Sequence, residues 1–524
     1  MASSKEENLR PSRRRVMQYA GLAIAASAYS ADPGKARAAE PAEPPSPQPQ
    51  ETASPTYPDQ ISEVTARLTT YMSEAKDKEL PKHALEQAKW HVLDTIAAIV
   101  SGTELPGGRS AVAFVRAYGG GKELATVIGD TVLCGPLEAA LANGVSAHAD
   151  ETDDSWPGGW HPGCSIIPAA LATGEQFGIS GAHFVRAAAL GYDVGARMLL
   201  AVREGLERTH KATHAVAGVW GAAAAASCAA SLNPQQMRWM LDYTAQQCSG
   251  IASWYRDIDH IEKGFVYGGM PARSGVTSAL LVRAGWNGVD DVLSGRDNFL
   301  LANNPQANAE LLVEKLGERF EIAGTNLKRW TVGSPVQAPL DAMEALLKQH
   351  PIRPDQVQKI LLRSAPGSVV DNSQPPDINI QYAMALMIID KNATFRSIHN
   401  KQRMQDPVIL QLRSKVVLEA PAAGGRGRGA DRPPLLEVTL TDGTRFTQDT
   451  GAVLGTIDNP MTREQLVAKC TDLMAAVIGA ETSKRLVDRV LELEETKDIR
   501  ELRPLLQWNR KPGSPIFADY PKAG

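Results

Sequence analysis

The chain has 524 residues, of which 43% are hydrophobic and 22% charged, and its formal net charge is −4. This charge balance excludes a polybasic nucleic-acid-binding protein and gives no sign of a polyanionic tail. At roughly 150 residues per domain, the length allows two to four domains. The Ala-rich, aromatic-poor composition favours helices, and five cysteines without a CxxC pair argue against a disulfide framework.

Residues 1–38 have the pattern of an export signal. Residues 12–18 contain three consecutive arginines, a short Ala-rich apolar run follows, and Ala36-Arg37-Ala38 matches a small-x-small cleavage site. The segment therefore resembles a twin-arginine signal peptide. The apolar run is too short to span about 30 Å of hydrocarbon. We predict a periplasmic protein with no stable membrane anchor after cleavage, and a Pro-rich disordered linker over residues 39–58.

Helical periodicity dominates residues 59–315. In residues 81–102, apolar side chains recur at three- and four-residue spacing, Pro81 suits a first helical turn, and Gly102 offers a stop. The alanines at 222–226 predict a closely packed core helix. Helices return after residue 455, where Thr462 and Gln465 form a capping-box pair. Residues 483–495 are amphipathic in the same way.

Between residues 316 and 452 the hydrophobic period shortens to that of strands. The predicted elements are strands at 317–323, 356–363 and 435–440, a hairpin turn at Thr441-Asp442-Gly443, and a helix at 336–349. Residues 424–429, GGRGRG, lack the flanking strand, helix and Lys-Ser/Thr of a phosphate loop, so we predict a flexible loop there.

The predicted fold class is therefore mainly α. A large all-helical domain built from both chain ends, 59–315 and 453–505, carries an inserted smaller α+β lid domain over 316–452. Residues 506–524 form a C-terminal tail.

Residues 145–164, VSAHADETDDSWPGGWHPGC, crowd ionisable groups beside two tryptophans. Carboxylates beside apolar rings have their pKa raised by desolvation, which suits proton transfer near neutral pH. A magnesium site is a weaker interpretation, because Asp153-Asp154 lacks a third carboxylate three residues on and EF-hand spacing fails. The flanking tryptophans argue against a solvated acidic loop. We therefore predict an acid/base site with no metal.

Short motifs follow one another in a characteristic order over residues 60–500. They are Leu93-Asp94-Thr95, residues 143–162, Gly191-Tyr192-Asp193, Lys263 with residues 268–276, Lys328-Arg329-Trp330, Gln381-Tyr382-Ala383 and Asn459-Pro460-Met461. In this order they resemble the MmgE/PrpD family, which includes 2-methylcitrate dehydratases, cis-aconitate decarboxylases and related lyases and isomerases. The resemblance implies a helical domain with a lid, in agreement with the division reached from periodicity.

The resemblance implies a cleft that binds a small carboxylate without a metal or organic cofactor. The implied catalytic residues are His161, Lys263, Glu151, Ser155 and Tyr382. His161 would move a proton at neutral pH. Lys263 would neutralise the negative charge that develops beside a carboxylate, and Tyr382 would donate to a leaving hydroxyl.

The implied substrate-binding residues are Lys328, Arg273, Asp154, His148, His214 and Tyr267. Lys328 would neutralise a substrate carboxylate, and Arg273 would bind one through two donors. His214 is a displaced candidate for a second family histidine. The resemblance also implies a homodimer and a small-molecule partner, with no nucleic acid.

Three site positions depart from the family pattern. Glu151 stands where the family has Asp, Tyr267 where it has His, and Gly333 where many members have a lid His. Dehydration, decarboxylation and isomerisation therefore all remain open. Two other classes are alternatives: a non-catalytic periplasmic carboxylate-binding protein, and a metal-dependent hydrolase that uses the acidic cluster at 148–154.

Overall fold

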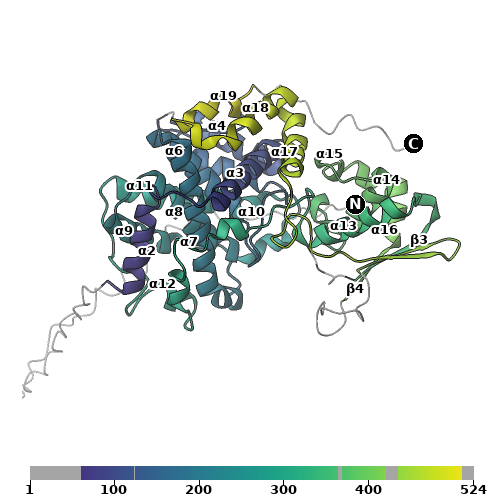
Figure 1. Cartoon of the computed structure of the whole chain (residues 1–524), viewed down its shortest axis with the longest axis horizontal. Coiled ribbons are helices and arrows are strands. Elements are labelled where there is room, and N and C mark those ends of the chain that lie inside the picture. Colours follow the sequence, from purple (N-terminus) through teal and green to yellow (C-terminus); the bar gives the residue numbers. More distant parts are fainter. Residues whose placement is uncertain (1–60, 123, 364–366, 368, 421–434, 510–524) are drawn as a thin grey trace, which may run out of the picture. The chain divides into compact units, whose positions relative to one another are not determined.

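The computed structural model describes residues 61–122, 124–363, 367, 369–420 and 435–509 (Figure 1). The predicted signal at 1–38, the linker at 39–58 and the loop at 424–429 lie outside the described residues. The predicted tail also lies outside them beyond residue 509.

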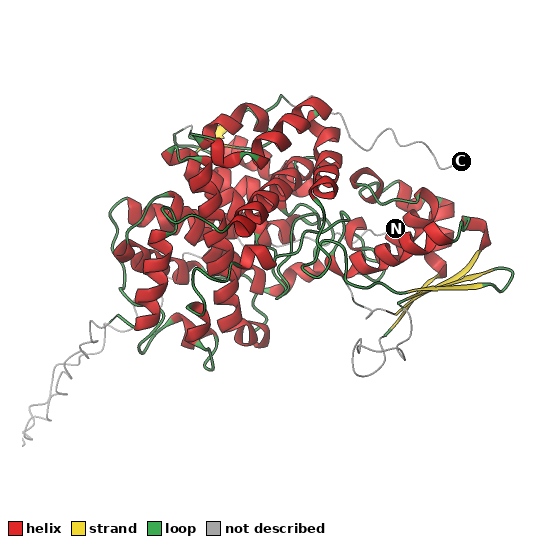
Figure 2. Ribbon diagram, viewed as in Figure 1, coloured by secondary structure: helices red, strands yellow, loops and turns green. Residues whose placement is uncertain are grey.

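The protein is mainly α, as predicted (Figure 2). The helices before residue 330 are α2 (Glu63–Glu74), α3 (Lys82–Gly102), α4 (Pro106–Tyr118), α5 (Pro136–Ala147), α6 (Gly163–Phe177), α7 (Gly181–Arg208), α8 (Thr213–Ala229), α9 (Pro234–Gln247), α10 (Ile261–Gly264), α11 (Met270–Arg283) and α12 (Phe299–Asn303). Those that follow are α13 (Ser334–Gln349), α14 (Ile380–Asp390), α15 (Phe395–Ile398), α16 (Pro407–Lys415), α17 (Arg463–Ile478), α18 (Ala480–Leu491) and α19 (Arg503–Leu506). None of the described helices is both long and apolar enough to cross a membrane.

The first hydrophobic core is built by helices from both ends of the chain. The alanines at 222–226 in α8 are fully buried, as predicted for a closely packed helix. A Cβ added at Gly191 of α7 would stand 2.8 Å from the carbonyl oxygen of Gly221 in α8, so glycine allows the two helices to approach. From the far end of the chain, α17 contacts α3 (yellow and purple in Figure 1) and contributes Leu466 and Cys470 to this core.

A second core lies around a four-stranded sheet whose strand order is β4-β3-β5-β6. Its strands are β3 (Val357–Arg363), β4 (Val416–Glu419), β5 (Leu436–Leu440) and β6 (Arg445–Gln448). β3 pairs parallel with β4 and antiparallel with β5, and β5 pairs antiparallel with β6. Helices α13, α14 and α16 bury Met343, Met384 and Ile409 in this core. A separate pair, β1 (Ala125–Thr126) and β2 (Leu133–Cys134), is antiparallel.

Most sequence-predicted elements of this region are confirmed, with one exception. The strands at 356–363 and 435–440, the hairpin and the helix at 336–349 all form. The strand predicted at 317–323 is wrong: the chain makes a 3₁₀ turn over Glu321–Gly324. Asp193 of α7 accepts the backbone N–H of Glu321 at 2.6 Å, and Ile322 is buried in the first core. This segment is therefore held by helices and has no strand partner. The domain boundaries themselves stay a prediction.

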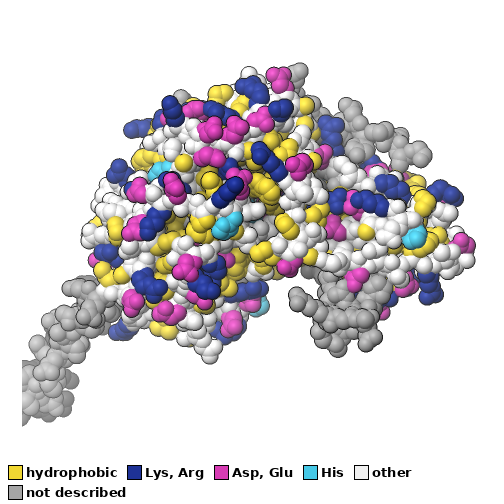
Figure 3. All heavy atoms as spheres, in the orientation of Figure 1, with side chains coloured by type: hydrophobic (Ala, Val, Ile, Leu, Met, Phe, Trp, Pro, Cys, Tyr) yellow, Lys and Arg dark blue, Asp and Glu magenta, His cyan; other side chains and the backbone are white. Residues whose placement is uncertain are grey.

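Two smaller predictions also hold. Thr462 and Gln465 form the capping box at the start of α17. The five cysteines are free thiols, and four of them are buried. On the face seen in Figure 3, charged side chains of both signs are interspersed, as the small net charge suggests.

Candidate active site

The segment between α5 and α6 carries the predicted motif into the protein interior. His148, Asp150, Glu151, Asp153 and Asp154 are each at most 3% exposed. His161 is 8% exposed. Burial of so many ionisable groups is costly unless each has a partner. A solvated acidic loop is thereby excluded, and the partners of these groups show what the site can do.

The adjacent residues Asp153 and Asp154 interact with different neighbours. Asp154 accepts hydrogen bonds from Tyr192 at 2.6 Å and from the backbone N–H of Gly163 at 2.9 Å, and it lies 2.7 Å from Nδ1 of His91. These partners lie on α3, α6 and α7, so Asp154 holds the motif onto the helical core. The structure does not place it among the cations described below, and its role in substrate binding stays a prediction.

Replacing Asp154 with asparagine is expected to destabilise the fold. The amide nitrogen would face groups that now donate, which leaves at least one buried donor unsatisfied, at about 1–3 kcal/mol. The midpoint of urea denaturation should fall accordingly. The matched control is Asp488→Asn, which breaks the exposed pair with Lys484 and should change the midpoint little. Equal midpoints for the two variants would contradict this role of Asp154.

Asp153 anchors two imidazoles. Nδ1 of His148 lies 2.9 Å from Oδ1 of Asp153, and Nδ1 of His161 lies 3.3 Å from the same oxygen. Burial alone would raise the pKa of the Asp153 carboxyl, but the two imidazoles hold it well below its usual range. Burial lowers the pKa of His148. Asp153 is therefore an anion that orients both imidazoles.

Glu151 meets two lysine ammonium groups away from water. The ammonium of Lys263 contacts the Glu151 carboxylate directly. Nζ of Lys328 lies 3.6 Å from Oε2 of Glu151 and donates to the Glu151 carbonyl at 2.6 Å. Burial would raise the pKa of Glu151, but these two cations hold it well below its ordinary value. Two buried cations thus lie against Glu151, and Nζ of Lys328 also lies 3.8 Å from Oδ1 of Asp153.

The ammonium of Lys328 also reaches His161. Its Nζ lies 3.4 Å from Nδ1 of His161, so this nitrogen lies between a donor and the Asp153 acceptor. With its proton on Nδ1 the neutral ring has a basic Nε2, and the imidazolium formed when Nε2 takes up a proton can give that proton back from the same nitrogen. The same ring can therefore take up a proton and return it.

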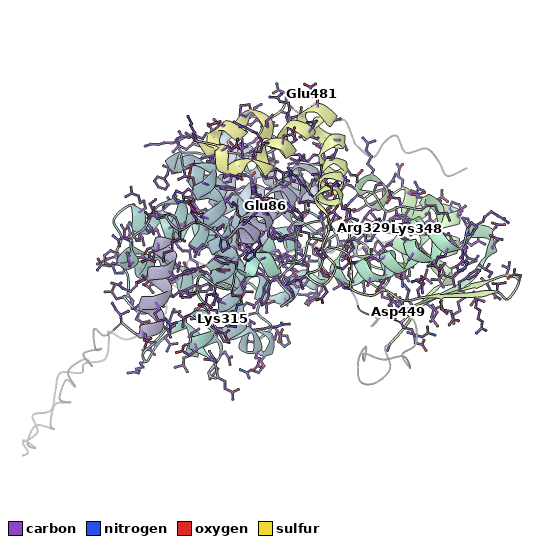
Figure 4. The ribbon with its side chains drawn as sticks, in the orientation of Figure 1. Glu86, Lys315, Arg329, Lys348, Asp449 and Glu481 are labelled. Atoms are coloured by element: carbon purple, nitrogen blue, oxygen red, sulfur yellow. The ribbon has the colours of Figure 1, made fainter. Side chains whose placement is uncertain are left out.

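Lys328 is held in place by its neighbour in sequence. Arg329, labelled in Figure 4, donates to both carboxylate oxygens of Glu344 on α13 at 2.7 and 2.6 Å. This bidentate pair is the geometry that constrains a guanidinium most strongly.

Tyr267 stacks between two histidines of the cluster. Its ring centroid lies 4.5 Å from that of His148 and 3.9 Å from that of His214, with interplanar angles of 18° and 15°. It sits in a π-helical turn, Phe265–Gly269, an irregularity often found at functional sites. Burial holds the pKa of His214 well below 6.5 and that of Tyr267 well above 10. All three rings are therefore neutral at physiological pH, and the cations of the cluster are lysines.

His260 and Asp377 join the cluster although the sequence interpretation did not include them. Nε2 of His260 lies 3.9 Å from Oε1 of Glu151, and its Nδ1 lies 3.5 Å from Oδ2 of Asp377. His260 has φ 60 and ψ 22, a left-handed conformation that costs energy outside glycine and often marks functional sites. Its three-residue spacing to Lys263 is a signal that could have found it. Asp377 carries no such local signal.

A cavity of about 280 Å³ opens onto this cluster. Trp254, His260 and Lys263 line one wall, and residues of the loop before α14, including Asn372 and Gln374, line the other. The ammonium of Lys263 also lies 5.2 Å from the centroids of Trp254 and Tyr267, within cation–π range. The volume is close to the lower end of the roughly 300–1,000 Å³ typical of small-molecule sites.

Two family models match this chain: the MmgE/PrpD N-terminal domain over residues 66–311 and the MmgE/PrpD C-terminal domain over residues 330–493. The chain belongs to the MmgE/PrpD family. It is similar to a cis-aconitate decarboxylase of Aspergillus terreus, 24% identical over 478 residues that cover 85% of this chain and 96% of the relative. It is likewise similar to a human cis-aconitate decarboxylase, 26% identical over 482 residues, 85% of this chain and 95% of the relative.

Several predicted site residues of this MmgE/PrpD chain lie outside the cluster. Tyr382 is buried in the second core, where its hydroxyl donates to the carbonyl of Ser397 at 2.7 Å. Arg273 is exposed on α11. Ser155 lies at the margin, with its hydroxyl 3.5 Å from that of Ser334. The structure therefore brings together Glu151, His161, Lys263, Lys328, His148, His214 and Tyr267, and leaves Tyr382, Arg273 and Asp154 apart.

Gly333 lies beside Glu151 in the MmgE/PrpD site. A Cβ added there would lie 3.7 Å from Cγ of Glu151. The same Cβ would lie 3.3 Å from Cγ2 of Ile378, so a side chain at this position would contact both Ile378 and Glu151. His260 approaches the Glu151 carboxylate from α10.

Three side chains could together hold one metal ion. His148, Glu151 and His260 each offer a ligand atom, and these atoms lie within 4.8 Å of one another. Nε2 of each histidine is buried without a hydrogen-bond partner. The ammonium of Lys263 already neutralises the Glu151 carboxylate, so a cation would compete with it for that oxygen.

The burial of His260 predicts an acid-sensitive fold. Burial lowers the pKa of His260 from 6.5 to about 4. The unfolded chain therefore binds more protons between these pH values, so the free energy of unfolding falls as pH is lowered from 6.5 to 4. The full contribution is about 3 kcal/mol. His260→Gln should flatten the pH dependence of the urea midpoint across this window. A slope equal to that of the wild-type chain would contradict the assignment.

Proposed function

We propose that this chain is a cofactor-independent lyase or isomerase that removes a proton next to a carboxylate of a small substrate. Membership of the MmgE/PrpD family and the likeness to cis-aconitate decarboxylases support a lyase-type function. The observation that carries the proposal is the buried convergence of Lys263 and Lys328 on Glu151, beside His161.

The two ammonium groups suit the charge that such a reaction creates. Removing a proton next to a carboxylate spreads negative charge onto its oxygens. Preorganised cations in a dry site stabilise that charge without reorganisation, because they are already oriented and desolvated. Lys263 lines the cavity and can reach a substrate carboxylate, while Lys328 connects that region to His161.

The proton itself would pass through an imidazole. The contacts of His161 run through Nδ1, so Nε2 is the nitrogen available to a substrate. His260 lines the cavity, and its lowered pKa keeps it neutral and able to accept a proton near pH 7. One imidazole could remove a proton, and the second could protonate a leaving group or return the proton elsewhere.

The experiment that tests this proposal is a product screen. Purified protein from about Glu40 onward is incubated with di- and tricarboxylates, including cis-aconitate and 2-methylcitrate, and followed by proton NMR. A new vinyl signal with loss of water or CO₂ identifies a dehydratase or decarboxylase, and a shifted double bond identifies an isomerase. Thermal stabilisation by an acid that yields no product would instead favour a carboxylate-binding protein.

A metal-dependent hydrolase is a second candidate, because His148, Glu151 and His260 lie close enough to share an ion. On the first proposal, dialysis against EDTA should leave kcat/KM unchanged, since Lys263 supplies the positive charge at Glu151. Loss of activity that Mg²⁺ or Zn²⁺ restores would favour the hydrolase.

Export and assembly remain part of the proposal. The three arginines and the small-x-small site at 36–38 support a periplasmic protein, and the resemblance to the family supports a homodimer. Cell fractionation with Arg13→Lys/Arg14→Lys/Arg15→Lys, and light scattering of the mature chain, test these two statements.

A further inference from the structure

A second cavity, of about 380 Å³, is also lined by His260. Its walls are largely hydrocarbon: they include Leu105, Pro106, Ala149, Ile258, Pro375 and Pro376. Burying a hydrocarbon group in such a space is favourable in proportion to the apolar area removed from water.

The basic residues near this cavity are each paired with an acid. The pairs are Arg109 with Glu104 at 3.2 Å, Lys401 with Asp259 at 3.2 Å, and His399 with Asp150 at 3.1 Å. Asp377 faces His260 and accepts the backbone N–H of Glu151 at 3.0 Å. A ligand carboxylate would therefore find no unpaired cation among these residues, whereas Lys263 forms part of the wall of the neighbouring cavity.

The two cavities share part of their lining. Ile258, His260 and Pro375 line both of them. A molecule that places a carboxylate near Lys263 can therefore extend an attached group past His260 into the apolar space. Its reacting carbon would then lie beside His260, which lines both cavities.

We propose that the second cavity binds an uncharged hydrocarbon branch of the substrate, so that the enzyme acts on carboxylates bearing an alkyl or similar apolar substituent. This inference rests on the proposed function for the role of the first cavity. It adds a substrate class, because a compact, fully charged tricarboxylate would leave the apolar space unfilled.

The test is calorimetric binding of 2-alkylsuccinates from methyl to hexyl to the mature protein. Affinity should rise about fourfold per added methylene until the cavity is filled, and the heat capacity change should become more negative with chain length. An affinity that is flat or falls beyond methyl would overturn the proposal, whether or not any of these acids is turned over.

Two matched variants locate the effect. Gln402 is exposed and lines only the second cavity, so Gln402→Trp adds bulk there with little risk to folding. It should lower the hexyl-to-methyl affinity ratio at least tenfold. Gln411→Trp, at an exposed position of α16 outside both cavities, should preserve that ratio. A ratio unchanged by Gln402→Trp would contradict the proposed location.

Proton NMR of the same acids separates this inference from the proposed function. Chain-length-dependent binding without proton exchange or product would support the apolar cavity and count against the lyase or isomerase. Turnover of methyl-substituted acids, with no gain in affinity from longer chains, would support the proposed lyase or isomerase and overturn the proposed role of the apolar cavity.

Discussion

Lys263→Met is expected to lower kcat/KM by about 10²–10³-fold, the usual effect of removing one preorganised group that stabilises developing negative charge. Methionine keeps much of the side-chain volume but removes the ammonium that contacts Glu151. It also leaves Glu151 buried with Lys328 as its remaining lysine partner. Breaking a buried ion pair costs about 3–5 kcal/mol, so the thermal midpoint should fall as well.

Lys89→Met separates these two effects. Lys89 is also buried, and its ammonium lies 2.8 Å from both Glu86 and Glu494, away from the site. The Lys89→Met variant should be less stable than the wild-type protein but should keep the wild-type kcat/KM, measured at a temperature where both variants are folded. A loss of activity in Lys89→Met as large as in Lys263→Met would mean that the effect is one of folding.

His161→Gln is expected to lower kcat by about 10²–10⁴-fold, the range for a group that transfers a proton in the transition state. Glutamine can keep a hydrogen bond toward Asp153 but cannot take up a proton. The pH dependence of kcat/KM should lose the limb that the imidazole provides. Steady-state kinetics across pH, with the acid found in the product screen, measure both quantities.

The companion variants for His161 are His260→Gln and His183→Gln. His183 lies on α7 and hydrogen-bonds the carbonyl of Cys228 at 2.8 Å, so its replacement should leave the pH profile intact. If His260→Gln removes one limb and His161→Gln the other, the two imidazoles divide the roles of acid and base. A wild-type profile in His161→Gln would exclude it as the proton-transfer group.

Local patterns in the sequence predicted the elements whose partners are near in the chain. The capping box at Thr462 and the hairpin at Thr441-Asp442-Gly443 depend on residues within a few positions, and both form. The strand predicted at 317–323 failed because alternation alone does not supply a pairing strand. In the fold, Asp193 and the first core hold that segment instead.

The sequence likewise predicted only some residues of the candidate site. The resemblance located Glu151, His161, Lys263 and Lys328, which do converge. It named Asp154 and left out Asp153, because neighbouring residues in a loop point to different sides and only the fold shows which of them faces the histidines. Asp377 was not predicted, because it is far from Glu151 in sequence and accepts the backbone N–H of Glu151 only in the folded chain.

The most direct test of the central claim is solvent exchange. Wild-type protein and the double variant His161→Ala/Lys263→Ala are incubated in D₂O with the carboxylates of the product screen, and the C–H signal next to the carboxylate is followed by proton NMR. The wild-type protein should remove this signal for at least one acid, while the double variant should be no faster than buffer. Equal exchange in both proteins would show that the proton is not abstracted at this cluster.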